Sequence, residues 1–293
     1  MTAPRALPAT PVAPAARTPL TWLVENGLAA LPDALQGPLS QALGTVAYLL
    51  AARQRAAVRA NLAIVAADRP DRRALERCVF VSQVRHYLGI FRLLRLDPRE
   101  LLDTVEIAGW EHFAEAYAQG KGVVVGSAHL GPVSVCGQIF VAKGIPITMP
   151  VEREGGTLAR TVNRARSVHG TRFVSTESAL GIYRVLRQGG LLGILADRAV
   201  TGVGERVPFF GREALLPSAH VVLALRTGAP LLPGFARRDG KRLLATFEPA
   251  LELEPTGDHE RDVRAGVRRF AEVMERHIRL APEQWSVFDR VWP

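Results

Sequence analysis

The sequence predicts an α/β fold in which a mixed, mostly parallel central sheet is flanked by helices. Three observations support this prediction. From residue 105 onward, short apolar runs of strand length alternate with stretches that have helical spacing, as in a sheet covered on both faces. Residues 20–96 have a mostly helical pattern instead. Hydrophobic residues make up 48% of the 293, enough for a sizeable core.

The chain divides into three parts. Residues 1–19 are rich in alanine and proline without a continuous apolar run, so we expect a disordered tail and no secretory signal. Residues 20–104 are expected to form a helical, membrane-associating region, and residues 105–293 the α/β core. The longest apolar run near the N-terminus, Val46–Ala52, is far shorter than the roughly 20 residues of a spanning helix. Membrane association would therefore be peripheral.

One helix of the N-terminal region carries an apolar stripe. Four side chains recur at helical intervals: Leu39, Leu43, Val46 and Leu50. Three arginines follow at once: Arg53, Arg55 and Arg59. Pro38 can occupy the first turn of this helix. An apolar face flanked by arginines suits a helix lying in a membrane interface, and it suits equally a helix that faces the core. A longer helix is expected over residues 72–95.

In the core, five apolar runs predict strands and the intervals between them predict helices. The strands are expected at 123–125, 145–149, 191–195, 231–235 and 243–247. The helices are expected at 155–169, 177–188, 216–227 and 258–279. No internal repeat is visible, so these elements form one continuous unit.

The charge and the cysteines narrow the class of partner. A net charge of +9 and a pI of about 10.4 favour anionic partners such as phospholipid headgroups, nucleic acid or acyl carrier protein. No nucleic-acid-binding motif accompanies the charge, so nucleic acid is not an expected partner. Cys78 and Cys136 form no CxxC pair, and we predict neither a disulfide framework nor a zinc site.

A histidine follows the first predicted core strand. The strand is followed by Ser127-Ala128-His129-Leu130-Gly131-Pro132, and the proline can begin a helix. Open α/β sheets bind ligands at the carboxyl ends of their strands. Imidazole titrates near neutrality, which suits a general base. His129 is therefore the candidate catalytic residue, with a structural or surface histidine as the alternative.

A long glycine-rich segment between a predicted strand and helix is the second candidate. It begins with Asp197-Arg198 and ends with Pro208-Phe209-Phe210-Gly211. Such loops often carry function. The phenylalanine pair could line an apolar groove, or it could hold the loop to the core. The motifs of an α/β-hydrolase nucleophile, of phosphate-binding loops and of HExxH zinc sites are absent.

Several motifs occur in one order along the chain. They are Arg59–Leu62, Ala128–Pro132, Arg166–Gly170, Asp197-Arg198, Pro208–Gly211, Leu223–Pro230 and Pro282–Trp285. Together they resemble the lipid A biosynthesis acyltransferases, which include the lauroyl- and myristoyltransferases of lipid A and the acyltransferases of phosphatidylinositol mannosides. The resemblance covers roughly residues 25–290. Its most specific parts are the segments PFFG, TGAP and PEQW.

This resemblance implies a glycerolipid acyltransferase-like fold and a reaction. A fatty acyl chain would pass from an acyl thioester to a hydroxyl of a membrane glycolipid, phospholipid or lipid A-like precursor. Acyl-CoA or acyl carrier protein would be the co-substrate and, with membrane lipids, the expected partner. No metal and no bound cofactor are expected. The protein would act peripherally at the cytoplasmic face of the inner membrane.

The resemblance also implies roles for individual residues. His129 would remove the proton of the acceptor hydroxyl. Backbone N–H groups near Gly131 or Val133 would stabilise the oxyanion, and Arg153 and Arg166 would hold phosphate groups of acceptor or donor. The expected substrate-binding set is Gly131, Arg153, Arg166, Asp197, Arg198, Phe209 and Phe210.

One position departs from the family. The acidic residue of its His-x4-Asp/Glu pattern, which orients the histidine, is replaced here by Ser134. The Ser134 hydroxyl can accept a hydrogen bond from the imidazole but carries no charge. Glu205, just before the PFFG segment, is therefore our preferred substitute acid, and Glu152 is the second candidate. The alternative is a catalytically weak or inactive relative that only binds lipid.

Overall fold

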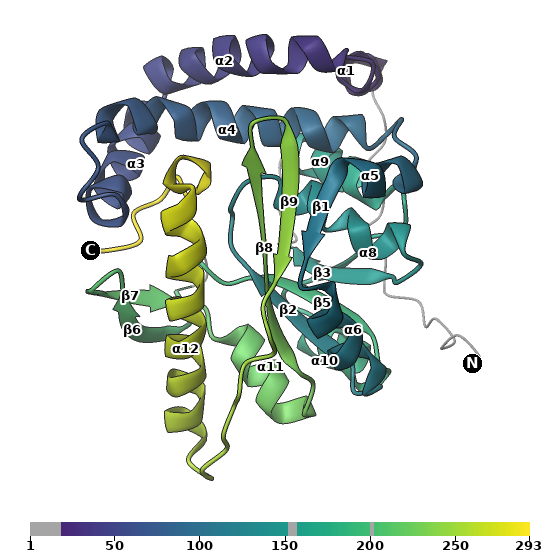
Figure 1. Ribbon diagram of the computed structural model, residues 1–293, viewed down its shortest axis with the longest axis vertical. Coiled ribbons are helices and arrows are strands. Elements are labelled where there is room, and N and C mark those ends of the chain that lie inside the picture. The colour runs from purple at the N-terminus through teal and green to yellow at the C-terminus, as the bar shows by residue number, and fades with distance from the viewer. Residues whose placement is uncertain (1–18, 152–156, 200–201) are drawn as a thin grey trace.

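A seven-stranded sheet lies at the centre of the computed structural model, which describes residues 19–151, 157–199 and 202–293 (Figure 1). In spatial order its strands are β1, β9, β8, β2, β5, β3 and β4. Neighbouring strands run parallel, except that β8 and β9 are antiparallel. The predicted mixed, mostly parallel sheet is confirmed. The predicted tail, 1–19, lies outside the described residues apart from Pro19.

Five of the strands lie where apolar runs predicted them. The bounds are β1 (Val105–Ala108), β2 (Val123–Ser127), β3 (Ile147–Val151), β4 (Arg172–Ser175), β5 (Leu191–Leu195), β8 (Leu231–Asp239) and β9 (Arg242–Phe247). Strands β1 and β4 have no counterpart among the predicted strands. Each has only four residues and forms an edge of the sheet. An edge strand is covered less completely, and so it leaves a weaker apolar pattern.

The glycine-rich segment is not the long loop that the sequence predicted. Its second half forms an antiparallel hairpin of β6 (Glu205–Phe209) and β7 (Arg212–Leu216). Phe210 and Gly211 make the turn with positive φ angles of 51° and 73°, as a two-residue hairpin turn requires. Val207 and Phe209 point into the core while their neighbours are more exposed. This alternation of buried and exposed residues is typical of a strand, but the neighbouring glycines made the segment resemble a loop in the sequence.

Helices cover both faces of the sheet. They are α6 (Trp110–Ala118), α8 (Gln138–Ala142), α10 (Ala179–Arg187), α11 (Ala219–Thr227) and α12 (His259–Leu280). Because successive strand residues point to opposite faces, β2 contributes to two cores. Val124 packs with residues of α10, α11 and α12. Val123 and Val125 pack with Phe113 of α6 and Phe140 of α8. The three-layer arrangement thus follows from a strand that is apolar throughout.

The N-terminal helices form a separate layer at one end of the sheet (Figure 1). The remaining helices are α1 (Pro19–Ala29), α2 (Asp33–Leu50), α3 (Ala52–Val65), α4 (Arg72–Arg92), α5 (Pro98–Thr104), α7 (Val133–Cys136) and α9 (Thr157–Ser167). The expected helix at 72–95 is confirmed as α4, and α2 lies along its outer side. Pro38 lies inside α2, so its expected place in the first turn is wrong.

The apolar stripe of α2 faces away from the core. Leu43, Val46 and Leu50 are 45%, 51% and 80% exposed, and Leu39 is half-buried. The face of α2 that contacts α4 carries small residues instead, with Ser40 and Gly44 buried. The interpretation of the stripe as core-facing is therefore wrong. Within the described residues, none of the helices combines the length and the hydropathy that crossing a bilayer would require.

His220, near the start of α11, is buried in the core. Its ring lies edge-on to that of Phe270 at 4.5 Å between centroids. Neither ring nitrogen has a hydrogen-bond partner among the described residues. Burial in this apolar site lowers the pKa of His220 to about 3, because the imidazolium would lose its hydration without gaining a partner.

This buried imidazole predicts an acid-dependent loss of stability. In the unfolded chain the pKa is about 6.5, so below that pH the unfolded state binds a proton that the folded state excludes. The contribution is complete above pH 6.5 and falls as the pH approaches 3, by about 1.4 kcal/mol per unit. We expect urea denaturation of His220→Leu to show a smaller loss between pH 7 and pH 5. Equal losses in the two proteins would contradict this.

Candidate active site

Two neighbouring strands bring His129 and Asp197 together. Strands β2 and β5 pair in parallel, so their carboxyl ends lie at the same edge of the sheet. His129 lies two residues beyond β2, and Asp197 lies two residues beyond β5. The N–H of Ala196 donates to the carbonyl of Ser127 at 2.8 Å, which continues the pairing past the strand ends. The adjacency of the strands therefore sets the spacing of the two side chains.

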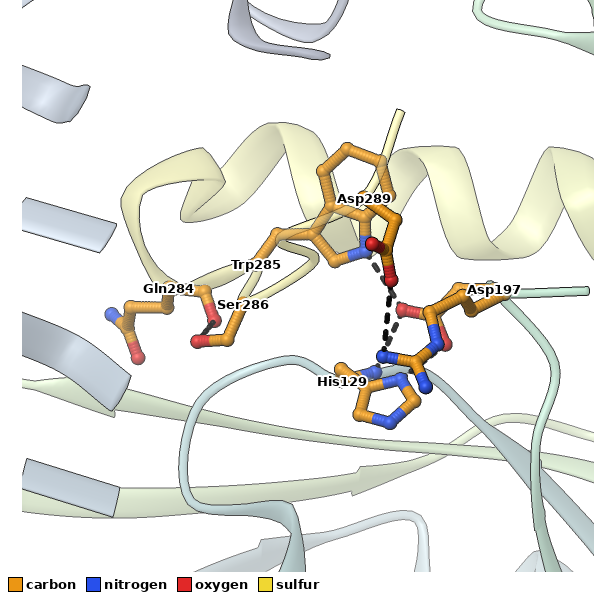
Figure 2. Close-up of polar contacts among 7 residues, drawn as sticks. His129, Asp197, Gln284, Trp285, Ser286 and Asp289 are labelled. Carbon is orange, nitrogen blue, oxygen red and sulfur yellow. Dashed lines mark hydrogen bonds and ion pairs between the residues drawn. The ribbon is translucent and has the colours of Figure 1, made fainter. Parts of the chain in front are cut away.

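Asp197 is completely buried and accepts three hydrogen bonds (Figure 2). Its Oδ1 is 2.7 Å from Nδ1 of the His129 ring. Its Oδ2 accepts from the backbone N–H of His129 at 2.9 Å and from the indole Nε1–H of Trp285 at 2.8 Å. Each carboxylate oxygen has a partner, so the side chain is held in one orientation.

This geometry determines the state of both groups. Burial alone would raise the pKa of Asp197, but the charge and hydrogen bonds of His129 and the Trp285 indole hold it below its ordinary value. Asp197 is thus an ionised carboxylate that can only accept, so Nδ1 of His129 carries the hydrogen. The lone pair is then on Nε2. The His129 side chain is 36% exposed and lines a cavity, so Nε2 can act as a base.

Residues 284–286, near the C-terminus, bind the loop that carries His129 through backbone hydrogen bonds (Figure 2). The N–H of Ser286 donates to the carbonyl of His129 at 2.8 Å, and the N–H of Gly131 donates to the carbonyl of Gln284 at 2.9 Å. Leu130 and Trp285 form an isolated β-bridge. The PEQW segment thus orients the catalytic loop and the carboxylate together. The PEQW motif alone does not predict this contact of Trp285 with the buried carboxylate.

A polar cavity of about 420 Å³ lies beside His129. Its walls come from α4, the loop after β2, α7 and α9. The described polar residues that line it are Gln83, His86, Tyr87, His129, Ser134, Asn163, Arg166 and Ser286. None of the described residues that line it carries a carboxylate. A volume of this size can receive a polar head of a substrate next to Nε2 of His129.

A second pocket is almost entirely apolar and adjoins the first. It lies between the sheet and the helices α7 and α8, and the two pockets share Val133 and Leu195 in their walls. Glycines at positions 137, 193 and 234 and aromatic side chains form much of its lining. Its volume is about 50 Å³, much less than that of the polar cavity, so it has room for only a few methylene groups beside the base. Among the described residues, no group of His, Cys, Asp or Glu suits a metal ion.

The structure gives the position beside His129 to Asp197 and not to Glu205. Glu205 begins β6, and its Oε2 lies 3.2 Å from Nε of Arg264 on α12. Ser134 is buried and lines the cavity, but no hydrogen bond joins it to the imidazole, whose Nδ1 is engaged by Asp197. Asp197 therefore occupies the position beside the imidazole that we expected Glu205 to take. The sequence had suggested a substrate-binding role for Asp197. Glu152 lies outside the described residues.

The remaining expected site residues are divided between the cavity and the core. Arg166 lines the polar cavity, as does Gly131. Phe209 is fully buried and stacks on Trp292 at 5.5 Å, while the N–H of Phe210 donates to Glu275. This pair holds the hairpin to the core and lines neither of the two pockets described above.

Three further expectations have specific outcomes. Arg198 forms an ion pair with Asp289 at 3.4 Å. Arg153 lies outside the described residues. The Gly131 N–H is already engaged by the Gln284 carbonyl, so it is not available as an oxyanion donor. Gly131 itself has a φ of +54°, and a Cβ there would lie 2.8 Å from the carbonyl oxygen of Ala236, so close packing requires the glycine.

Comparison with known proteins gives concordant matches. A family model described as bacterial lipid A biosynthesis acyltransferase matches residues 13–293. The chain is similar to the phosphatidylinositol mannoside acyltransferase of Mycobacterium tuberculosis, with 27% identity over 230 residues, 72% of this chain and 68% of that protein. The enzyme of that name from Mycolicibacterium smegmatis is 27% identical over 255 residues, 80% and 78% of the two chains. The lipid A biosynthesis acyltransferase of Haemophilus influenzae is 23% identical over 267 residues, 88% and 81%.

Proposed function

The chain belongs to the bacterial lipid A biosynthesis acyltransferase family, and we propose that it transfers a fatty acyl chain from an acyl thioester to a hydroxyl of a membrane glycolipid precursor. The observation that carries this proposal is the position of His129. Its Nδ1 is held by a buried carboxylate, and the side chain lies in a polar cavity that adjoins an apolar pocket. The donor is acyl-CoA or acyl carrier protein, and no metal or bound cofactor takes part.

His129 acts as the general base in this reaction. Nε2 removes the proton of the acceptor hydroxyl as its oxygen attacks the thioester carbon. The carbon–sulfur bond of the tetrahedral intermediate then breaks, and the imidazolium returns the proton to the leaving thiolate. Asp197 holds the ring and stabilises its positive charge. Base catalysis of this kind typically contributes about 10²–10⁴-fold, and positioning of the two substrates contributes further.

We assign one of the two substrates to each pocket. The apolar pocket takes the methylene groups next to the thioester of the donor, because burial of methylene groups there is favourable at about 0.8 kcal/mol each. The polar cavity takes the head of the acceptor. Val133 and Leu195, which line both pockets, then lie beside the thioester.

Filling the apolar pocket should shorten the preferred acyl chain. A Cβ at Gly193 would lie 3.1 Å from Cδ1 of Ile147, at the flexible end of a side chain, so a larger residue can be accommodated there. We expect Gly193→Val to favour a shorter acyl donor over palmitoyl-CoA by about tenfold, since a few methylene groups lose their site. Rates with a series of acyl-CoA chain lengths measure this. An unchanged preference would show that the chain binds elsewhere.

We also propose that α1 and α2 bind the protein peripherally to the cytoplasmic face of the inner membrane. Eight of the twelve exposed large hydrophobic residues within the described part of the chain belong to these two helices: Trp22, Leu23, Val24, Leu35, Leu43, Val46, Leu49 and Leu50. Arg53 follows and is exposed, whereas Arg55 is half-buried and donates to the carbonyls of Tyr48 and Leu49. An apolar face bordered by arginines suits an interface with anionic lipids. The free cysteines suit a reducing compartment.

Polar replacements on this face should release the protein from membranes. Leu49 and Leu50 are 63% and 80% exposed. We expect Leu49→Ser with Leu50→Ser to weaken binding to vesicles of phosphatidylglycerol and phosphatidylethanolamine by at least about tenfold, because two leucines no longer enter the interface. Ala42→Ser, also on an exposed position of α2, is the control. Co-sedimentation measures the binding. Equal binding of all three proteins would contradict the proposal.

The function itself is tested by following both products. Purified protein in detergent is supplied with deuterated palmitoyl-CoA, or with the acyl carrier protein loaded likewise, and with a glycolipid extract. We expect thiol release together with a lipid ester that carries the deuterium, detected by mass spectrometry. His129→Ala is the matched control. Lipid binding without thiol release would favour the alternative motivated by Ser134, an inactive lipid-binding relative.

A further inference from the structure

Asn61 of α3 is a buried amide whose hydrogen bonds go to residues near the C-terminus. Asn61 is 2% exposed. Its Nδ2 donates to the carbonyl of Val287 at 3.3 Å and to that of Asp289 at 2.9 Å. Its Oδ1 accepts from the N–H of Val291 at 3.2 Å. One side chain therefore satisfies three backbone groups of a single short stretch, residues 287–291, and fixes its conformation.

The position of Asn61 is fixed in turn by contacts between α3 and α4. Arg59, two residues earlier, donates to both carboxylate oxygens of Glu76 on α4, with Nε–Oε1 and Nη2–Oε2 distances of 3.0 Å. Glu76 is buried. Phe288 also packs on α4, where its ring lies edge-on to that of Phe80 at 5.0 Å between centroids. The stretch that Asn61 binds is thus anchored on the N-terminal helices.

The same stretch is continuous with the residue that holds the buried carboxylate. Trp285 lies two residues before it, is 2% exposed, and donates from its indole Nε1 to Oδ2 of Asp197 at 2.8 Å. Farther along, the carboxylate of Asp289 pairs with Arg198, the chain neighbour of Asp197, at 3.4 Å (Figure 2). Residues 285–291 thus form a segment that is held by α3 on one side and contacts the catalytic carboxylate on the other.

The indole of Trp285 affects how firmly Asp197 is held as an ionised carboxylate. Within the described residues, two N–H groups bind its Oδ2: the backbone N–H of His129 and the indole. The first belongs to the histidine loop itself, so the indole is the donor that comes from another part of the fold. Burial raises the pKa of Asp197, and the charge and hydrogen bonds of His129 together with the indole lower it. With the indole displaced, Asp197 would bind a proton more readily and would be free to turn away from the imidazole.

We propose that Asn61 is a positioning residue for the pair of Asp197 and His129. It acts through residues 287–291 and the indole of Trp285, and the proposal rests on the proposed function for the reaction that the pair performs. Asn61 lines neither of the two pockets described above. Loss of its amide releases two carbonyls and one N–H of the segment, and the segment then no longer holds the indole against the carboxylate. The effect therefore falls on turnover more than on substrate binding.

Four variants of the full-length protein test this role: Asn61→Ala, Trp285→Phe, the two combined, and Trp292→Phe. The last is the matched control, because Trp292 is also buried but its indole donates to the carbonyl of Phe209 at 3.2 Å. We expect Asn61→Ala and Trp285→Phe each to lower kcat for acyl transfer from palmitoyl-CoA by about tenfold, with KM changed by less than about threefold. The control should keep kcat within about threefold. The combined variant should lose no more than Trp285→Phe alone, since both changes act on one contact.

The pH dependence separates positioning from a general loss of stability. Because the pair titrates as a unit, a carboxylate that binds its proton more readily moves the acid limb of kcat/KM to higher pH. We expect this shift in Asn61→Ala and in Trp285→Phe but not in Trp292→Phe. Circular dichroism shows that each variant is folded at the assay temperature. Losses that multiply in the combined variant, or an acid limb that stays in place in Asn61→Ala, would overturn the proposal.

A spectroscopic signature tests the same role without turnover. The proton between Nδ1 of His129 and Oδ1 of Asp197, which are 2.7 Å apart, should give a downfield proton resonance that His129→Ala lacks. We expect this resonance to move in Asn61→Ala and in Trp285→Phe and to stay in place in the control. A moved resonance in a protein that releases no thiol would refute the proposed reaction and keep the positioning role. An unmoved resonance in Asn61→Ala, in a protein that transfers acyl groups, would refute the positioning role alone.

Discussion

Replacement of Asp197 by asparagine is expected to lower the rate of acyl transfer by about 10³–10⁴-fold while the fold is kept; the upper value is that of the corresponding change in serine proteases. Oδ2 accepts from two N–H donors, so the single oxygen of asparagine should face them. The amide group would then face Nδ1 of His129 and require it to accept. The proton of the neutral ring would move to Nε2, which would no longer be a base.

Thiol release from acyl-CoA measures this effect, and circular dichroism shows that the fold is intact. Glu205→Gln is the matched control, since it removes one carboxylate whose partner, Arg264, is at the surface. A surface pair of this kind contributes little, so we expect a change of less than about threefold. A large loss in Glu205→Gln with normal turnover in Asp197→Asn would restore the substitute acid predicted from the sequence.

The second large effect is expected in the contact between α2 and α4. Gly44→Ala should destabilise the protein by about 1–3 kcal/mol, the usual cost of overpacking. The new Cβ would lie 2.5 Å from Cα of Val81, which is backbone and cannot rotate away. The two helices must then separate. Because α2 carries much of the exposed apolar face, vesicle binding should fall together with stability.

Gly37→Ala in the same helix is the control for this experiment. No atom lies within 4 Å of a Cβ at that position. Alanine has the higher helix propensity, so Gly37→Ala should stabilise the protein by up to about 1 kcal/mol. Urea denaturation measures both variants. Opposite signs support tight packing of α2 on α4, whereas stabilisation by both substitutions would show that α2 is not held against α4.

Several elements of the fold follow from local pattern alone. The apolar runs that became β2, β5 and β9 are long enough and apolar enough to be recognised without neighbours. The position of His129 beyond a buried strand likewise placed it at the carboxyl edge of the sheet. Such features depend on residues that are close in sequence, and so the sequence by itself determined them.

The partner of His129 depended on tertiary structure. Asp197 lies beside it because β5 pairs with β2. Trp285, near the C-terminus, donates a hydrogen bond to Asp197. The order of strands in a sheet is not encoded by periodicity, so Glu205 was as plausible a partner from the sequence. The hairpin of β6 and β7 then turned Glu205 toward α12 and Phe209 into the core.

The α/β class, the main strands and the catalytic histidine were determined by the sequence, because each is a property of a short segment. The orienting carboxylate, the position of Arg166 in the cavity wall and the outward direction of the α2 stripe were decided by the tertiary structure. Helical spacing shows that apolar side chains share a face, but not what that face meets. The small residues Ser40 and Gly44 take the contact with α4, and the leucines are left exposed.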